Sequence, residues 1–438
     1  MKMQGLSFEN IPPIHIPFRF YIVAPLFGLL AAILLFVGNP DHYGTRLSPL
    51  LLSVTHLFTL GFMLMIMFGS LFQMLPVLSG ESIPDARFVS TAVFSFLSLG
   101  LILLVISFFF SQRQLLYFAV LSLVVAFLTF LISLSSVLIK KIGGKESIFT
   151  MRLSVISLFI TIFIGLYRAM SYVYPMPFTY LTDLNFHVGW GIFGWCLLLV
   201  MGVSYQVIPM FHVTPSYPSR LTRIVPSSIF IILIFLSFIQ IKAAETGLVI
   251  LLSFLIAGYA IYSLYLFTKR KRKVPDIIIS FWRLAMISLI MTVAVYMGNR
   301  FLGDVVELPV LWDSTSILIG LFMIFGFVST VIIGMLQKIV PFLIYHHLQR
   351  LCITDFEALK TLPHMHMIIS SRRSRWQLYI HVASLIMLVS AVLYRPLLKP
   401  AAIILALDFI WLGISIIRAT RLYMLKKKEI MAMKESML

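Results

Sequence analysis

Long apolar segments are the feature of this sequence that most restricts its fold. The hydrocarbon core of a bilayer is crossed by about 20 mainly apolar residues per helix, and twelve such segments follow one another along the chain. Charged residues make up only 11% of the sequence, against about a quarter in soluble domains. We therefore predict an all-α polytopic membrane protein with twelve transmembrane helices, which excludes a water-soluble fold. The segments begin near Phe18, Pro49, Phe88, Gln114, Phe149, Asp183, Ile224, Thr246, Ile277, Asp313, Trp376 and Leu397.

The basic residues predict the direction in which the chain crosses the membrane. The net charge of +18 arises from 34 Lys and Arg against 16 Asp and Glu. With a cytoplasmic N-terminus, 27 of these 34 basic residues fall on the inner side, as the positive-inside rule requires. We expect a bacterial inner-membrane protein with both termini in the cytoplasm, whose basic residues meet the lipid bilayer rather than nucleic acid. The inner set includes Lys140, Lys141, residues 269–273, Arg372, Arg373, Arg375 and residues 426–428.

The start of the chain offers no other targeting signal. The first 16 residues have no short apolar core followed by a small-residue cleavage site. The first helix is therefore expected to act as its own insertion signal.

A short motif, Gly-x-x-x-Gln-x-x-Pro, occurs three times at a constant spacing. It covers residues 69–76 and 202–209, and a third copy at 334–341 has Lys338 in place of Gln. The copies begin 133 and 132 residues apart. A second marker shares this period, because three arginines precede the motif glycines by 50, 50 and 51 residues: Arg19, Arg152 and Arg283.

These two markers predict an internal repeat of four helices. The units are expected at about 17–141, 149–273 and 277–425 of a single membrane domain, arranged as a ring of three four-helix arcs. The third unit carries a cytoplasmic insertion at about 345–375. In each copy the Pro is expected to end or kink its helix and the Gly to allow close helix approach. The Gln or Lys is expected to satisfy backbone groups that the Pro frees.

Ionisable side chains within the membrane are candidates for function by default. His56 lies 17 residues before Gln73 and His187 lies 19 before Gln206, which places them roughly 25 and 28 Å from the inner boundary at the α-helical rise. Arg168 and Arg300 fall in the same outer layer, each 34 residues before its motif glycine. Neutral imidazoles bind haem iron, and guanidinium groups pair with propionate carboxylates. The alternative is that these side chains bond to neighbouring helices or reach the interface.

A second group of histidines falls on the inner side. His346 and His347 precede a His-x-His pair at residues 364–366, and His381 follows about one and a half turns inside helix eleven. Imidazole suits zinc, copper and iron, so His346, His347 and His381 are further candidate metal ligands. An amphipathic loop on the membrane surface explains the 345–375 segment equally well.

Two stretches resemble known membrane proteins. The run His56-Leu57-Phe58-Thr59-Leu60-Gly61, continuing to Gln73-Met74-Leu75-Pro76-Val77, is similar to NnrS-like proteins, and so is the opening Pro17-Phe18-Arg19. Twelve helices in three arcs, with histidines in helices two and six, resemble subunit I of the heme-copper oxidase superfamily. The resemblance implies an oxidase-like scaffold, haem with or without copper, and a role in nitric oxide or respiratory stress.

The resemblance also implies roles for two histidines. His56 matches the helix-two ligand of the low-spin haem, and His187 lies where a helix-six copper ligand is expected. Helix seven has no histidine, helix ten has none in its body, and Gly191 stands where a tyrosine partner is expected. A standard oxygen-reducing binuclear centre is therefore not predicted.

The favoured hypothesis is an integral membrane haem protein, with copper as a second candidate cofactor. If it is an enzyme, it is an oxidoreductase, with an electron-transfer partner that the sequence does not identify. The alternative hypothesis is a transporter or channel for a small solute or anion, because buried arginines and Pro-broken helices are typical of cavity-lining transporter helices.

Overall fold

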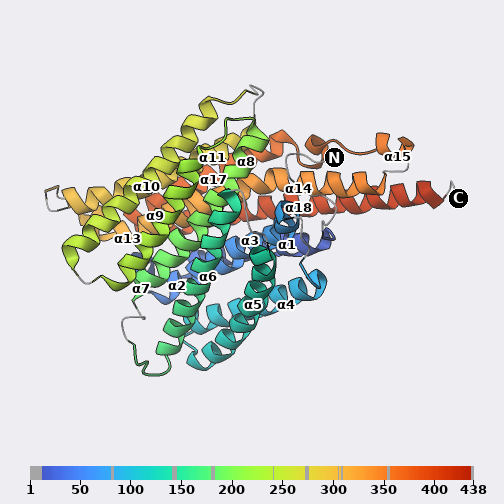
Figure 1. The fold of residues 1–438 in the computed structure, drawn as a ribbon. Coiled ribbons are helices and arrows are strands. Elements are labelled where there is room, and N and C mark those ends of the chain that lie inside the picture. The colour runs from blue at the N-terminus through green and yellow to red at the C-terminus, as the bar shows by residue number, and fades with distance from the viewer. Residues whose placement is uncertain are drawn as a thin grey trace.

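The protein is an all-helical bundle (Figure 1). The computed structural model describes residues 12–79, 83–140, 146–178, 183–239, 241–271, 276–303, 305–306, 309–352 and 356–435. Among these residues, 12 helices are long and apolar enough to cross a membrane, and no strand occurs. The predicted all-α polytopic class and the twelve spans are confirmed. Lys141 and residues 272–273 of the basic runs lie outside the described residues.

The spans begin within five residues of the predicted starts, because hydropathy and capping signals agree. Pro49 follows the N-cap Ser48, whose hydroxyl accepts a hydrogen bond from Leu51 N at 3.1 Å, and Pro is favoured at the first helical position. The spans are His15–Val37 (α1), Pro49–Pro76 (α2, η2 and part of α3), Ala86–Phe109 (α4), Arg113–Ile139 (within α5, which runs to Lys140), Glu146–Ser171 (α6), Leu184–His212 (α7, η4 and α8), Ser219–Phe238 (α9), Lys242–Thr268 (α10), Ile277–Leu302 (α11), Thr315–Leu351 (α13, η5 and α14), Ser371–Leu393 (α17) and Arg395–Glu435 (η6 and α18).

Three of the spans, the second, sixth and tenth, are the most buried and form the centre of the bundle. Each is an α-helix interrupted by a π-helical segment of eight residues: η2 (Leu57–Leu64), η4 (Trp190–Leu197) and η5 (Phe322–Ser329). These segments begin 133 and 132 residues apart, the same spacing as the sequence motif. Such wide turns occur frequently at functional sites in helices.

The motif glycines allow close helix approach, as predicted. A Cβ atom on Gly69 would lie 2.9 Å from the Cβ of Phe20, and one on Gly334 would lie 2.5 Å from the Cβ of Phe281. A Cβ on Gly202 would lie 3.1 Å from the backbone oxygen of Ser147. Each central helix is thus pressed against the first helix of its own predicted unit, α1, α6 or α11.

The motif prolines do not end their helices, and Lys338 does not bond to the backbone of its own helix, in contrast to the sequence-based expectation. Pro76, Pro209 and Pro341 lie inside helices that continue beyond them, which membrane helices tolerate when neighbours satisfy the freed backbone groups. Lys338 does not bond within its own helix. Its ammonium donates to the backbone oxygen of Phe211 at 3.4 Å, at the end of α8.

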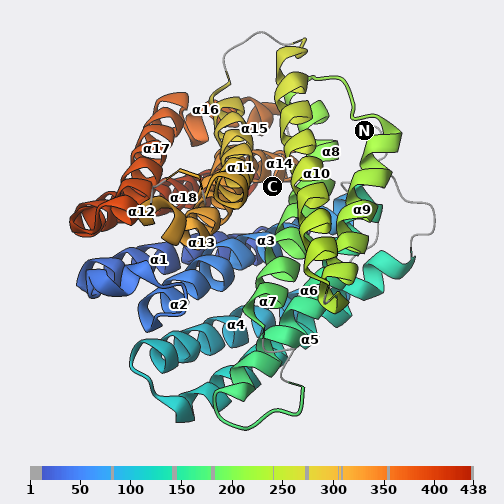
Figure 2. The same cartoon turned by 90° about the vertical axis from the view of Figure 1, so that its left-hand side faces the viewer.

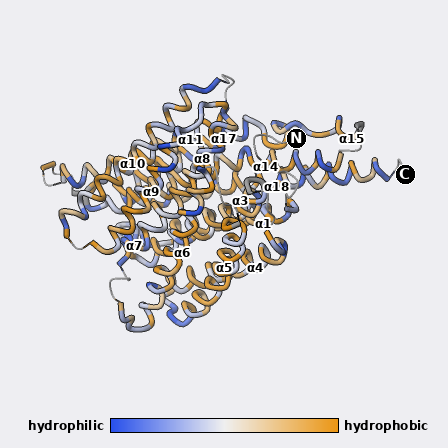
Figure 3. The backbone as a smooth tube through the Cα atoms, viewed as in Figure 1, coloured by the Kyte–Doolittle hydropathy of each residue, from blue (hydrophilic) through white to orange (hydrophobic). Residues whose placement is uncertain are grey.

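The first and last spans lie side by side, which closes the bundle. α1 packs along α18, while α5 packs on α6 and α10 on α11. Figure 2 shows α17 and α18 next to α1 at the left of the view, with α9 and α10 at the right. The start of α1, the C-terminal end of α18 and helix α15 (Phe356–Lys360) project toward one end of the bundle in Figure 1. Figure 3 shows that the projecting end of α18 is the more hydrophilic part of that helix. The predicted 345–375 insertion therefore comprises the end of α14, α15, α16 (Met365–Ile368) and the start of α17.

Candidate functional site: a cavity between two histidines

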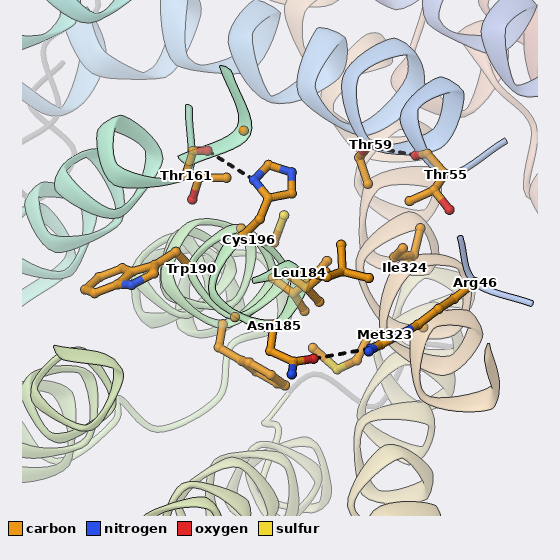
Figure 4. Close-up of a pocket in the computed structure, with 18 of the residues that line it drawn as sticks. Arg46, Thr55, Thr59, Thr161, Leu184, Asn185, Trp190, Cys196, Met323 and Ile324 are labelled. Carbon is orange, nitrogen blue, oxygen red and sulfur yellow. Dashed lines mark hydrogen bonds between the residues drawn. The ribbon is translucent and has the colours of Figure 1, made fainter. Parts of the chain in front are cut away.

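A cavity of about 820 Å³ lies among the central helices. It is lined mainly by apolar side chains of the second, sixth and tenth spans, with contributions from α4, α5, α6, α10 and α11. This volume is in the upper part of the range typical of ligand and cofactor sites. All three π-helical segments, η2, η4 and η5, contribute to its wall, and Figure 4 shows part of the lining.

His56 is the last residue of α2 (Pro49–His56) and lines the cavity directly before η2. Its Nδ1 lies 2.7 Å from the backbone oxygen of Leu52, one turn earlier. A carbonyl oxygen only accepts, so Nδ1 carries the proton and the Nε2 lone pair is left for another partner. A histidine whose Nδ1–H donates to a backbone carbonyl is the usual arrangement of a metal-binding imidazole.

His187 is held in the same way by a different helix. It lies in the short helix α7 (Leu184–Gly189), whose N-cap Asp183 accepts from Asn185 N at 2.7 Å. The Nδ1 of His187 lies 3.2 Å from the backbone oxygen of Thr161 on α6. Gly165 of α6 makes room for the ring, because a Cβ there would lie 2.7 Å from Cε1 of His187.

The two imidazoles face the same cavity at a separation that suits a shared metal ion. Their ring centroids are 6.5 Å apart and their planes differ by 14°. Two imidazoles that bind one metal ion from opposite sides, each at about 2 Å, have centroids about 6 Å apart. The two predicted histidines are therefore brought together by the fold.

The arginines differ in their placement. Arg168, in the last turn of α6, lines the cavity as anticipated. Arg300 is exposed at the end of α11 and is not part of the lining. Arg46, in the loop before α2, lines the cavity instead, and its Nη1 donates to Asn185 Oδ1 at 3.3 Å (Figure 4). Sequence reasoning missed Arg46 because it lies in a loop, where depth cannot be counted along a helix.

The inner histidines do not assemble into a cluster within the described residues. His346 and His347 lie near the end of α14 and do not line the cavity, and His364 and His366 are exposed. No three His, Cys, Asp or Glu side chains among the described residues come together as a metal site. The surface-segment interpretation of 345–375 thus agrees with the exposure of its central histidines.

His381 is buried elsewhere and has protein partners on both ring nitrogens. Its Nδ1 lies 2.7 Å from Asp408 Oδ2 on α18, and its Nε2 lies 2.8 Å from Thr330 Oγ1 on α14. Asp408 was missed from the sequence. It is the only acidic residue between Leu398 and Arg418 of the last span, so the rule that intramembrane charge marks function would have found it.

Comparison with known proteins adds no identification. No protein-family model matches the chain, and no curated protein matches its sequence.

Proposed function

We propose that this chain is an integral membrane haem protein, in which His56 and His187 would hold the iron of one haem in the outer half of the membrane. The observation that carries the proposal is the pair itself. Two half-buried imidazoles from different spans line one cavity, with ring centroids 6.5 Å apart. Each has its Nδ1 engaged by a backbone oxygen, which leaves both Nε2 atoms available to a metal.

The other lining residues support this assignment. The apolar wall would enclose a porphyrin and keep water away from the iron, and Arg168 and Arg46 supply guanidinium groups for its carboxylates. With both imidazoles bound to its iron, haem would supply one-electron chemistry. Leu52 and Thr161 fix the ring orientations through their carbonyl oxygens, while Gly165 leaves the space that the His187 ring needs.

Copper is not included in this assignment. The proposed haem uses His56 and His187, which leaves Cys196 and Met323 as the soft donors among the described lining residues, with no further histidine beside them. His381 is also left out, because both its ring nitrogens are hydrogen-bonded within the protein.

The proposed scaffold is a ring of three related four-helix units, similar to subunit I of the heme-copper oxidases. Its support is the common period of the sequence motif and the π-helical segments, together with the packing of α1 on α18. The proposed location is a bacterial inner membrane with both termini in the cytoplasm, supported by the excess of basic residues at the inner ends of the spans.

The test is optical spectroscopy of protein purified after expression with abundant haem. We expect a Soret band with a low-spin, six-coordinate spectrum. His56→Ala and His187→Ala should each remove an axial ligand and abolish that low-spin spectrum. His364→Ala is the matched control, since His364 is exposed and outside the cavity.

Two outcomes would count against haem. Absence of any Soret band would refute the cofactor, and an unchanged low-spin spectrum in either alanine variant would exclude that histidine as a ligand. Solute or anion flux in liposomes, without a bound chromophore, would favour the transporter hypothesis instead.

A further inference from the structure

A second polar group is buried behind the cavity wall, between α14 (Thr330–Leu351), α17 (Ser371–Leu393) and α18 (Leu398–Glu435). His381, Asp408, Gln377 and Thr330 have no exposed surface. Gln377 donates through Nε2 to Asp408 Oδ1 at 2.5 Å and to its backbone oxygen at 3.2 Å. A carboxyl group at this depth is costly unless it is paired or neutral.

The hydroxyl of Thr330 connects this group to the cavity. Its Oγ1 lies 2.8 Å from His381 Nε2 and 3.1 Å from the backbone oxygen of Phe325. Phe325 belongs to η5 and lines the cavity, and its ring centroid is 4.4 Å from that of His381. A hydroxyl has one proton to donate, so Thr330 can donate to Phe325 or to His381, but not to both.

Counting protons gives two consistent states of this group. In the first, Asp408 is a carboxylate, His381 donates to it from Nδ1, and Thr330 donates to Nε2. In the second state, one proton has been added to the group. His381 now carries its proton on Nε2 and donates it to the Thr330 hydroxyl oxygen, while the proton formerly on Nδ1 has moved to Asp408 Oδ2. The Thr330 hydroxyl then donates its own proton to the backbone oxygen of Phe325. Only the second state makes both short contacts of Thr330 hydrogen bonds, because the hydroxyl oxygen accepts from His381 Nε2 while the hydroxyl proton is donated to Phe325.

We propose that His381 and Asp408 form an intramembrane proton-binding site whose occupancy is transmitted to the cavity wall through the Thr330 hydroxyl. The protonated state is electrically neutral, with the proton on the Asp408 carboxyl rather than in an ion pair, because burial disfavours separated charges. Loss of the proton leaves one negative charge and withdraws the Thr330 hydroxyl from the π-helical segment η5. This proposal does not depend on haem.

Other titratable groups on the surrounding helices do not supply a partner for this site. The neighbours along α1, α11, α14, α17 and α18 are exposed (Arg283, Arg375, Tyr379, Lys399 and Arg418) or have other partners (Lys338 with Asp276, Arg373 with Ser415, and Tyr21 with Ser70). The proton state is therefore set mainly by His381, Asp408 and their two hydrogen-bonding neighbours.

The experiment is infrared spectroscopy of the purified full-length protein as a function of pH. We expect the C=O stretch of a protonated carboxyl, shifted downward in heavy water, that disappears as the pH is raised through a midpoint. Asp408→Asn should remove this band. Asp41→Asn should leave it unchanged, because Asp41 is an exposed outer-loop residue.

Two further variants separate the proposal from a folding defect. His381→Gln removes the donor that stabilises the carboxylate, so the band should persist to a pH at least one unit higher. Thr330→Val removes two hydrogen bonds from the protonated state and one from the deprotonated state. The midpoint of the titration should therefore fall by up to about one pH unit.

Absence of any carboxyl band sensitive to Asp408→Asn, in protein shown to be folded by circular dichroism, would overturn the proposal. A midpoint that neither His381→Gln nor Thr330→Val moves would also overturn it. The Soret band reports the haem proposal separately.

Discussion

At the scale of single residues, three histidines inside the bundle differ in what their ring nitrogens contact. His56 and His187 each use Nδ1 on a backbone oxygen and face a cavity, whereas His381 uses both nitrogens on side chains. A backbone oxygen fixes the tautomer without adding charge, which suits a neutral metal ligand. A carboxyl partner allows a proton to be gained or lost, which suits proton binding.

The space beside His187 gives a residue-level prediction. Gly165→Ala would place a Cβ 2.7 Å from Cε1 and 3.1 Å from Nδ1 of His187. We expect the ring to be displaced, its bond to Thr161 to be lost, and the protein to be destabilised by about 1–3 kcal/mol. Thermal unfolding in detergent measures the stability, and haem content measures the effect on the site.

A matched control for this change is Gly258→Ala, in the interior of α10, where an added Cβ meets no atom within 4 Å. That variant should be neutral or more stable by about 0.5–1 kcal/mol, as expected for Gly to Ala in an open helical position. If the two substitutions changed the stability and the haem content equally, the close approach of α6 at Gly165 would not constrain His187.

At the scale of elements, one carboxylate contacts residues of three helices, α8, α11 and α14. Asp276 caps α11, accepting from Ile278 N at 3.0 Å. Its Oδ2 lies 3.3 Å from both Lys338 Nζ on α14 and His212 Nδ1 at the end of α8. Burial alone would raise the pKa of Asp276, but the nearby His212 imidazole, the positive charge of Lys338 and the hydrogen bond from Ile278 N together hold it well below its usual range.

This lowered pKa predicts a pH-dependent contribution to stability. A carboxyl whose folded pKa is below its unfolded value stabilises the protein fully above the unfolded pKa, near 3.9, and loses that contribution as the pH falls further. Asp276→Asn should therefore destabilise the protein by about 1–2 kcal/mol at neutral pH, a value reduced by partial solvent exposure. The difference from wild type should shrink below about pH 4, as followed by thermal unfolding.

The control for Asp276→Asn is Asp85→Asn, because Asp85 precedes α4 without a capping hydrogen bond from its side chain. It should change stability little at any pH. A constant difference between Asp276→Asn and wild type down to pH 3 would contradict the assigned role of the Asp276 charge.

The elements were predictable from sequence to different extents. The helix starts followed from hydropathy, because a span has to match the thickness of the hydrocarbon core. The positions of His56 and His187 along their spans followed from counting residues back from the motif. The π-helical segments could not be predicted, since one extra residue in a turn leaves the apolar composition of η2 or η4 unchanged. The contact of His187 with Thr161 and Gly165 on α6 also depends on how helices pack, so convergence of the two imidazoles was beyond the sequence.

At the scale of the whole molecule, both ends of the described chain lie at one end of the bundle (Figure 1). An even number of spans, such as twelve, places both ends on the same side of the membrane. The basic residues near those ends favour the cytoplasmic side. Single cysteines at Lys360 and Glu435 should therefore react with a membrane-impermeant maleimide only in inside-out vesicles, whereas a cysteine at Asp41 should react only from the outer side. The native residues Cys196 and Cys352 are buried, which keeps the background low.

Labelling of all three positions from one side would refute this topology. Labelling with the two sides exchanged would keep the twelve spans and reverse the orientation, so the positive-inside argument alone would be wrong.

The packing of the first span on the last has a consequence for how the protein is made. Phe409 of α18 packs against Gly28 of α1, and its ring centroid is 4.9 Å from that of Phe62 in η2. The ribosome releases α18 only after the eleven spans that precede it have been synthesised. Until then, α1 and η2, the segment that follows His56, lack their packing partner α18. A nascent chain stalled before α18 would already contain both histidines. The helix that packs behind α1 and η2 would still be missing. We therefore expect the site to mature late, after translation of the spans is complete.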